Sequence, residues 1–406
     1  MRLPACFLLI SSVSAARVLL AGEGIGARRH ALSAGSLAAL REGRDQRKGP
    51  RAGHSRLPEV PLPWRSWLQV VQKLAGGGYG TVYKARITCG NSGNSSTQFV
   101  AMKVMQLSGA AAREVKALRK MHGVTDYCAS SLGNPDHVDF QGRRHVLMPF
   151  MNQGDFYDLV SRCLSKPSCN CHRPPGMPLC WEAMGAPYSE PFVLALMLQV
   201  MRGVQALLRH HLVHMDLKLE NAMLHCEGVS CYAQVVDLGL SCPLHSDDCP
   251  SVGTPGYMAP EVWLQHGVGT SQNDVFSLGV MLYIFALGKM PPFGGDVDGS
   301  QTAAYRPRED PWLQLEHLQP LGDLIMRMLN PHPSHRLKLK EAIPRLHAII
   351  LNKSHTEDVR RMIEMSPEQA GAHGHMPECV YDHSGSRPWV PLPAALISAL
   401  CTWVAF

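Results

Sequence analysis

The stretch that decides the fold is Val213-His214-Met215-Asp216-Leu217-Lys218-Leu219-Glu220-Asn221. A second short motif, Val-Val-Asp-Leu-Gly, begins at Val235 and places Asp237 sixteen positions after Asn221. Phosphoryl transfer requires a carboxylate that accepts the proton of the substrate hydroxyl, a lysine that steadies the transferring phosphate, and an Asn and an Asp that hold Mg²⁺. Asp216, Lys218, Asn221 and Asp237 therefore form a candidate constellation for this chemistry.

A glycine-rich segment lies upstream, where it connects two β-type runs. Glycines allow backbone amides to approach phosphate oxygens that a Cβ would hold off. Lys103 follows in the next run, and Glu114 begins a helical pattern that could pair with it. The segment and its flanks comprise Ala75, Gly76, Gly77, Gly78, Tyr79, Gly80, Thr81 and Val82.

The wider pattern changes from strand-rich to helix-rich along the chain. The patterns predict strands over Thr81–Ile87, Phe99–Met105 and Val146–Phe150, and helices over Ala110–Met121, Phe192–His211 and Ser271–Leu287. Ser189 is the expected N-cap of the second helix, and Gly288 ends the third. Strands followed by helices predict an α+β protein with two lobes.

With Gly253-Thr254-Pro255-Gly256-Tyr257-Met258-Ala259-Pro260-Glu261 completing the series, residues 67–350 resemble the eukaryotic protein kinase family. The resemblance implies a two-lobed protein-kinase-like fold, with a small β-rich N-lobe and a larger α-helical C-lobe. It also implies binding of ATP and Mg²⁺.

Catalytic roles carry over from the family one residue at a time. Lys103 matches the lysine that contacts the α- and β-phosphates, and Glu114 matches its ion-pair partner. Asp216 matches the catalytic base. Lys218, two residues on, and Thr254 match residues of serine/threonine kinases, so the resemblance implies a Ser/Thr substrate.

Nucleotide and metal contacts carry over in the same way. Asn221 and Asp237 match the two metal ligands. The glycine-rich segment, with Val82, matches the loop over the phosphates. The remaining matched nucleotide-binding positions are Ala101 and Lys103 in the third strand, Met148, Phe150 and Met151 in the hinge, and Asp155 near the ribose.

The chain departs from the family pattern at four points. Ala75 stands where the first glycine is usual, Met215 replaces the arginine that normally pairs with a phosphorylated activation segment, and Leu238 replaces a phenylalanine. Glu114 lies only 11 positions after Lys103, fewer than is typical. Either the helix lies close to the strand, or Glu114 is not the partner of Lys103.

Two further matches concern the architecture. Glu261 is expected to pair with Arg336, and Asp274 is expected to anchor the catalytic loop from the central helix.

The cysteines suggest cross-links. Cys163, Cys169, Cys171 and Cys180 lie in an insertion before the long helix, where disulfides and a metal site are the alternatives. Cys242 and Cys249 lie in the activation segment. A bridge between these two could replace phosphorylation as the device that orders the segment.

Charge is concentrated at the N-terminal end. Residues 1–66 hold 11 Lys/Arg and 4 Asp/Glu, whereas the remaining 340 hold 28 and 29, a net charge of −1. Nucleic-acid binding depends mainly on Lys and Arg that neutralise phosphates, so the near-neutral body argues against it. We expect a monomer that binds a protein substrate.

Both ends of the chain carry candidate targeting segments. Residues 1–16 have the order of a secretory signal peptide, with a transit peptide or a buried helix as alternatives. Residues 17–66 are expected to be a mobile basic linker, either a solvated spacer or a segment attracted to anionic membranes. The C-terminal extension, 351–406, ends in an apolar tail that is an ordinary docked or frayed end, a membrane span or a removed lipid-anchor signal.

These features predict a protein serine/threonine kinase that transfers the γ-phosphoryl group of ATP. The alternative is a secreted pseudokinase that acts as a nucleotide-binding or partner-binding scaffold. The expected location is the secretory pathway or outside the cell, and the cytoplasm if residues 1–16 are not a signal peptide. A kinase domain behind a signal peptide and a basic arm resembles the rhoptry-type secreted kinases of apicomplexan parasites.

Overall fold

The computed structural model describes most of the chain between residues 57 and 365. All of these residues belong to the larger of two units of the chain, 34–406. The described ranges are 57–78, 80–88, 98–124, 127–132, 137–166, 181–184, 188–228, 230–246, 249, 253–263, 269–289, 291, 315 and 317–365. The predicted signal peptide, residues 17–56 of the basic linker, Cys169, Cys171, Cys180 and the apolar tail lie outside them.

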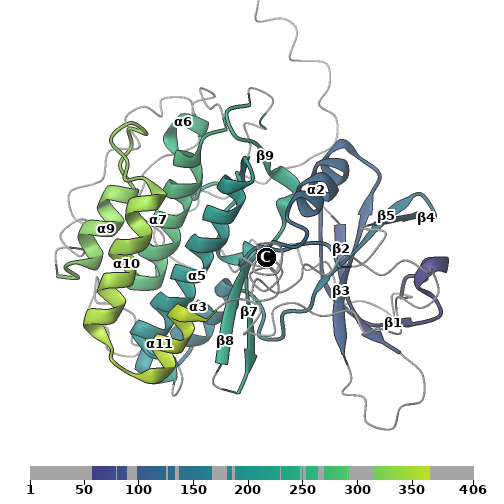
Figure 1. The fold of residues 1–406 in the computed structure, drawn as a ribbon, viewed down its shortest axis with the longest axis horizontal. Coiled ribbons are helices and arrows are strands. Elements are labelled where there is room, and N and C mark those ends of the chain that lie inside the picture. The colour runs from purple at the N-terminus through teal and green to yellow at the C-terminus, as the bar shows by residue number, and fades with distance from the viewer. Residues whose placement is uncertain are drawn as a thin grey trace, which may run out of the picture. The chain divides into compact units, whose positions relative to one another are not determined.

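A five-stranded antiparallel sheet forms the N-terminal lobe, with the order β1-β2-β3-β5-β4 (Figure 1). A short 3-10 helix, η1 (Leu62–Trp64), precedes it. A separate small core of the sheet includes Trp64, Trp67 and Met102. The strands are β1 (Leu68–Gly77), β2 (Gly80–Ile87), β3 (Phe99–Gln106), β4 (Val138–Phe140) and β5 (Arg143–Pro149).

One helix, α2 (Gly109–Lys120), belongs to this lobe. The Ser108 hydroxyl accepts a hydrogen bond from the Ala111 amide at 3.2 Å, which satisfies one of the free N–H groups of the first turn. Only Leu107 and Ser108 separate β3 from the helix, so α2 starts immediately beside the sheet. The short connection explains how Glu114, in the second turn, can reach Lys103.

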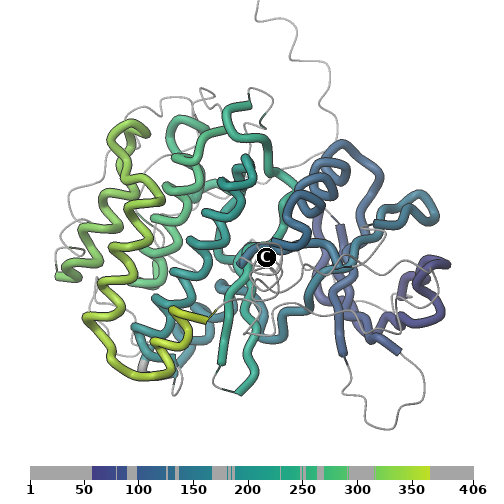
Figure 2. The backbone as a smooth tube through the Cα atoms, viewed as in Figure 1, coloured from purple at the N-terminus to yellow at the C-terminus, as the bar shows by residue number. Residues whose placement is uncertain are grey.

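The C-terminal lobe is helical, with two small strand pairs that lie between its helices and the sheet (Figures 1 and 2). Its helices are α3 (Phe156–Leu164), α5 (Glu190–Arg209), α6 (Pro260–Trp263), α7 (Ser271–Leu287), α9 (Leu321–Met328), α10 (Leu339–Lys353) and α11 (Glu357–Glu364). Its strands are β6 (Leu212–Val213), β7 (Ala222–Glu227), β8 (Ser230–Val235) and β9 (Cys242–Pro243). Its 3-10 helices are η2 (Trp181–Met184), η3 (Leu219–Asn221) and η4 (Leu238–Leu240).

The α5 helix is apolar because it passes through the core. By length and composition it could cross a membrane, but 78% of its most apolar window is buried inside the protein. Within the described residues it is the one helix that meets these criteria. Its sequence is therefore explained by burial in the helical lobe.

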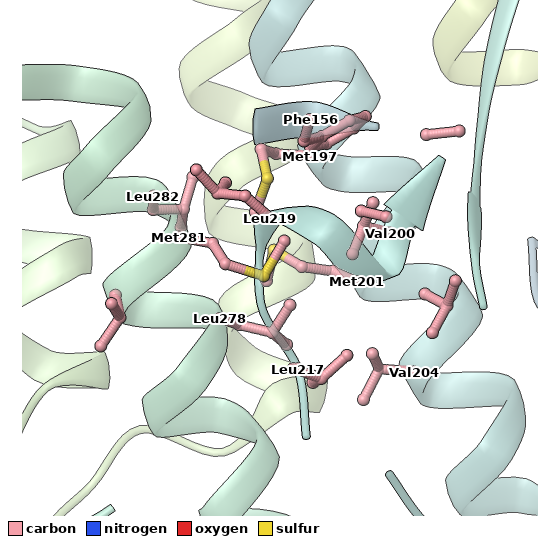
Figure 3. Packing of buried hydrophobic residues seen from close by; sticks show 14 of the residues in the cluster. Phe156, Met197, Val200, Met201, Val204, Leu217, Leu219, Leu278, Met281 and Leu282 are labelled. Carbon is pink, nitrogen blue, oxygen red and sulfur yellow. The ribbon is translucent and has the colours of Figure 1, made fainter. Parts of the chain in front are cut away.

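The catalytic loop is seated directly on this core. Leu217 and Leu219 are buried, and they pack among side chains of α5 and α7 that include Met201 and Leu278 (Figure 3). Leucines alternate with polar residues in this loop, so Asp216 and Lys218 are available to the functional site. Burial of two leucines thus fixes the backbone from which both polar side chains project.

The predicted elements agree with the observed ones to within two residues at most of their ends. The predicted strands correspond to β2, β3 and β5, and the predicted helices correspond to α2, α5 and α7. Ser189 is the N-cap position of α5, and Gly288 ends α7 in the left-handed conformation with φ of 67°. The two-lobed α+β class is confirmed.

Candidate active site

Lys103 lies between two carboxylates that are distant in sequence. Its Nζ is 2.5 Å from Glu114 Oε1 on α2 and 2.8 Å from Asp237 Oδ1, which follows β8. Lys103 is 5% exposed and Glu114 is 1% exposed, so this ion pair is shielded from water. The structure therefore confirms Glu114 as the partner of Lys103, despite the short spacing between them.

Burial and charge shift the pKa values of this cluster in different ways. Burial alone would lower the pKa of Lys103, but the attraction of Asp237 and Glu114 outweighs it and raises that pKa. Burial raises the pKa of Glu114 in spite of Lys103, and the charge of Asp237 raises it further. Burial also opposes ionisation of Asp237, yet Lys103 holds the pKa of Asp237 below its usual value. The cluster thus keeps a charged lysine beside an ionised Asp237.

The backbone at Asp237 adopts a left-handed conformation, with φ of 63° and ψ of 75°. A non-glycine residue rarely adopts this conformation, and such residues concentrate at functional sites. The preceding residue is fixed from both sides: the Val236 amide donates to the Asn221 carbonyl at 2.9 Å, and the Val236 carbonyl contacts His214 Nε2 at 3.0 Å. These contacts place Asn221 beside the segment that carries Asp237.

Asp216, Lys218 and Thr254 form a closed triangle of hydrogen bonds. Lys218 Nζ donates to Asp216 Oδ2 at 2.7 Å and to Thr254 Oγ1 at 2.8 Å, and Thr254 Oγ1 donates to Asp216 Oδ1 at 2.7 Å. Asn221 Nδ2 donates to the Asp216 carbonyl at 2.7 Å and to Oδ2 at 3.3 Å. The residues expected from the sequence are therefore brought together by direct hydrogen bonds.

The catalytic loop is anchored from α7 by Asp274. Its carboxylate accepts hydrogen bonds from the backbone amides of His214, at 2.8 Å, and Met215, at 3.0 Å. Met215 has φ of 68°, so the loop turns sharply at this point. The anchoring role expected of Asp274 is confirmed, and it holds the turn that precedes Asp216.

The expected nucleotide-binding residues of the sheet share one face. Val82 pairs with Lys103 across β2 and β3, and Ala101 pairs with Met148 across β3 and β5. Directly paired residues point to the same side of a sheet, as do residues two apart on one strand. Val82, Ala101 and Met148 therefore lie on the face that carries Lys103.

The other expected contacts follow β5 in the chain. Phe150 and Met151 directly follow β5, and Met151 is buried beside Tyr127 and Tyr232. Asp155 is the N-cap of α3, and its side chain accepts a hydrogen bond from the Asp158 amide at 2.8 Å. A role of Asp155 beside a ribose stays a prediction.

The glycine-rich segment forms the turn between β1 and β2. Ala75 pairs with Val82, Gly76 with Thr81 and Gly77 with Gly80, and residues 75–78 are exposed. Gly80 has φ of 136°, and a Cβ there would lie 2.7 Å from the Val104 carbonyl oxygen. Glycine is thus required at position 80, whereas Tyr79 lies outside the described residues.

Asn221 and Asp237 fit a Mg²⁺ site by their chemistry. Mg²⁺ prefers oxygen ligands and usually takes only one or two protein carboxylates, with substrate phosphates and water completing the shell. Asp237 Oδ1 contacts Lys103, and its side chain is 30% exposed. The described residues contain no group of three His, Cys, Asp or Glu side chains that would favour another kind of metal site.

The activation segment carries one of the expected disulfides. Cys242 and Cys249 are bonded, with both residues buried, and a Cβ at Gly269 would lie 2.1 Å from Cys249 Sγ. A second disulfide, Cys226–Cys231, closes the β7–β8 hairpin and was not expected from the spacing. The pairing of Cys242 with Cys249 is confirmed, and its ordering role stays a prediction.

The far end of the segment is tied to the helical lobe by Arg336. Its guanidinium bonds both carboxylate oxygens of Glu261, at 2.6 and 2.9 Å, and also the carbonyls of Gln272 and Asn330 at 2.7 and 2.8 Å. The expected Glu261–Arg336 pair is therefore confirmed as a bidentate contact in which the arginine is buried and the glutamate is partly buried.

Sequence reasoning missed one connection in the site, the ring of His214. This residue is fully buried. Its Nε2 is hydrogen-bonded to the Val236 carbonyl, and its Nδ1 accepts a hydrogen bond from the Asp216 amide at 3.3 Å. The available signal in the sequence is a histidine two positions before the catalytic Asp216. His214 links the catalytic loop to the segment that carries Asp237.

Comparison with known proteins agrees with this geometry. The chain is 34% identical over 169 residues to calcium-dependent protein kinase 8 of Oryza sativa subsp. japonica, which covers 39% of this chain and 30% of that protein. It is 27% identical over 300 residues to serine/threonine-protein kinase PLK4 of Drosophila grimshawi, which covers 70% of this chain and 34% of that protein. The chain thus spans about a third of the length of these relatives.

The family model described as "Protein kinase domain" matches residues 68–346, more than half of the chain. The match begins at β1 and ends within α10, so it contains every site residue described above. The chain belongs to the protein kinase family.

Proposed function

We propose that the protein is an active serine/threonine kinase that transfers the γ-phosphoryl group of ATP to protein hydroxyls. The observation that carries this proposal is the simultaneous presence of two assembled clusters. Lys103 contacts both Glu114 and Asp237, and Asp216 contacts both Lys218 and Thr254. Kinases require both the lysine–glutamate pair and the metal-binding aspartate in place for turnover.

Each side chain has a role that its contacts support. Asp216 accepts the proton of the substrate hydroxyl, and Thr254 and Lys218 donate to its two oxygens and hold them in a fixed orientation. Lys103 offers a charged ammonium to the phosphates, held by Glu114. Bound Mg²⁺ would neutralise phosphate charge, and Asn221 and Asp237 would hold it.

The preference for serine and threonine rests on Lys218 and Thr254. Serine/threonine kinases share this lysine and threonine in the family resemblance, and here the two side chains are bonded to each other at 2.8 Å. Two relatives, PLK4 and the Arabidopsis thaliana serine/threonine-protein kinase/endoribonuclease IRE1a, carry this activity in their names. Protein substrates follow from the same assignment.

The alternative function is a scaffold that binds partners without phosphate transfer. Ala75, Met215 and Leu238 depart from the family pattern, and this observation favours the alternative. However, a scaffold has no chemical need for Lys103 and Asp216 in contact with all of their partners.

The two functions predict different responses to Mg²⁺ and a non-hydrolysable ATP analogue in a thermal unfolding experiment. For the kinase we expect the unfolding midpoint to rise only when nucleotide and Mg²⁺ are both present. A ligand at 100 times its Kd adds about 2.7 kcal/mol to the free energy of unfolding. A midpoint unchanged by nucleotide with Mg²⁺ would favour a scaffold that binds only partners, whereas a nucleotide-binding scaffold is separated from the kinase by the absence of phosphate transfer. EDTA provides the control.

We also propose that the protein works in an oxidising compartment, reached through the secretory pathway. Disulfides persist in such compartments and are rare in the cytosol. The pairs Cys226–Cys231 and Cys242–Cys249 support this location. The proposal has three further parts. The protein is delivered as a rhoptry-type secreted kinase, it associates with membranes through the basic arm or the apolar tail, and it is a monomer.

The ordering role of the activation-segment disulfide is tested by a double substitution, Cys242→Ser with Cys249→Ser. A bridge that closes so short a loop contributes about 2 to 3 kcal/mol to the free energy of unfolding in the chain-entropy estimate. We expect a loss of this size in urea unfolding, together with a lower kcat, because the segment also carries Thr254.

The matched control is Cys226→Ser with Cys231→Ser, which opens the β7–β8 hairpin instead. We expect a similar loss of stability there but little change in kcat. Equal turnover in the two double variants would refute an ordering role for the Cys242–Cys249 bridge.

A further inference from the structure

The helix α11 lies beyond the part of the chain that matches the kinase family, which ends at residue 346. It has eight residues, and an isolated helix of this length is unstable in water. Its apolar positions Val359, Met362 and Ile363 follow the i, i+3, i+4 spacing, and each is 2% exposed. The helix therefore depends on its contact with the kinase lobes, where it packs against α5 and β8.

The end of α11 is held by side chains of the kinase domain. The last carbonyls of a helix lack partners within the helix. Here three carbonyls at the end of the helix accept hydrogen bonds from side chains of the kinase domain. Gln199 donates to Met362 at 3.0 Å, Arg202 donates to Ile363, and Tyr127 donates to Met365. We call residues 357–365 the strap.

Tyr127 connects the strap to β8 and α5. It follows α2 in the chain and is 4% exposed. Its backbone carbonyl accepts the Val235 amide at 2.9 Å, and the Ala129 amide donates to the Val235 carbonyl at 2.7 Å. A Cβ at Gly203 would lie 2.2 Å from the Tyr127 carbonyl oxygen, so α5 also touches this backbone.

Val235 is the last residue of β8 and lies two positions before Asp237. The helix that precedes Tyr127, α2, carries Glu114. The ring of Tyr127 also packs with Met151, which follows β5. Tyr127 thus lies where the strand that leads to Asp237 meets the residue that follows the hinge strand β5, in the stretch of chain that comes after the helix of Glu114.

We propose that the strap holds Tyr127 in place and that Tyr127 is a positioning residue for the Lys103–Glu114–Asp237 cluster. The effect on turnover rests on the kinase activity proposed above. The strap acts through a fixed tyrosine hydroxyl and the backbone pairing with Val235. Sequence beyond the family domain is then part of what assembles the active site.

The test compares three substitutions in the full-length chain. Val359→Asp places a charge on the buried face of the strap, and Tyr127→Phe removes only the hydroxyl that bonds Met365. Arg360→Asp introduces the same aspartate on the exposed face and is the matched control. We expect kcat to fall roughly 3-fold to 30-fold in Val359→Asp and about 3-fold in Tyr127→Phe, in the range of residues that act through packing networks.

Hydrogen exchange distinguishes this proposal from a purely local role of the strap, because a local role would leave exchange near the cluster unchanged. We expect the amides of residues 109–121 and 233–238 to exchange faster in Val359→Asp and in Tyr127→Phe, and at the wild-type rate in Arg360→Asp. Faster exchange confined to the strap and α5, or equal changes in all three variants, would overturn the proposal.

Two further outcomes are also decisive. If Val359→Asp does not fold, Tyr127→Phe decides, because it preserves the aromatic ring: faster exchange at 233–238 supports the proposal and unchanged exchange rejects it. If the wild-type chain transfers no phosphate, the kinase assignment fails, and the exchange comparison alone still decides whether the strap positions the cluster.

Discussion

Asp216→Asn is expected to lower kcat by about 10²-fold to 10⁴-fold, the range typical of general acid–base catalysis. The amide has the shape of the carboxylate but cannot accept the proton of the substrate hydroxyl. Its oxygen can still accept the hydrogen bond that Thr254 now donates at 2.7 Å, whereas its amide nitrogen cannot accept the one that Lys218 now donates at 2.7 Å. We therefore expect only a small fall in the thermal unfolding midpoint.

The measurement is steady-state phosphate transfer at saturating ATP, together with thermal unfolding of the same preparation. Asp323→Asn, an exposed aspartate paired with Arg327, is the control and should leave kcat unchanged. Wild-type turnover in Asp216→Asn would remove Asp216 from the role of base.

Arg336→Met is expected to cause the largest loss of stability, about 3 kcal/mol in the free energy of unfolding, the lower end of the range for ion pairs that lose one buried partner, because Glu261 is partly exposed. Arg336 is 3% exposed and makes bidentate contact with Glu261. Without the guanidinium, the Glu261 carboxylate and the carbonyls of Gln272 and Asn330 lose their donor. The free energy of unfolding of a typical domain is only about 5 to 15 kcal/mol in total.

Arg327→Met provides the comparison, because Arg327 pairs with Asp323 on the surface with 54% of its side chain exposed. Exposed pairs contribute about 0 to 1 kcal/mol. Urea unfolding of both variants measures the difference. Similar losses in the two variants would mean that the Glu261–Arg336 pair is not a buried structural link.

The catalytic loop could be predicted because its chemistry and its packing are both local. The alternation of Asp216 and Lys218 with buried leucines is visible in the sequence, and the structure places the two polar side chains beside Thr254. The Lys103–Glu114 pair was less certain, since it depends on how soon the helix begins. Two residues between β3 and α2 settle that question.

The strap could not be predicted, for a physical reason. Its apolar stripe spans only three positions in eight residues, too few to distinguish a docked helix from a short surface one. Its hydrogen-bond donors, Gln199, Arg202 and Tyr127, come from segments more than 150 residues away. Only the folded chain brings these donors to the carbonyl end of α11.

The most direct test of the kinase assignment is transfer of radiolabelled phosphate from ATP to a generic Ser/Thr acceptor by the full-length protein with Mg²⁺. Asp237→Ala serves as the control, because it removes the carboxylate expected to hold the metal. We predict transfer by the wild-type chain, loss of transfer in Asp237→Ala, and no transfer with EDTA. Absence of transfer by a folded wild-type protein that binds nucleotide, or equal transfer by Asp237→Ala, would contradict the assignment.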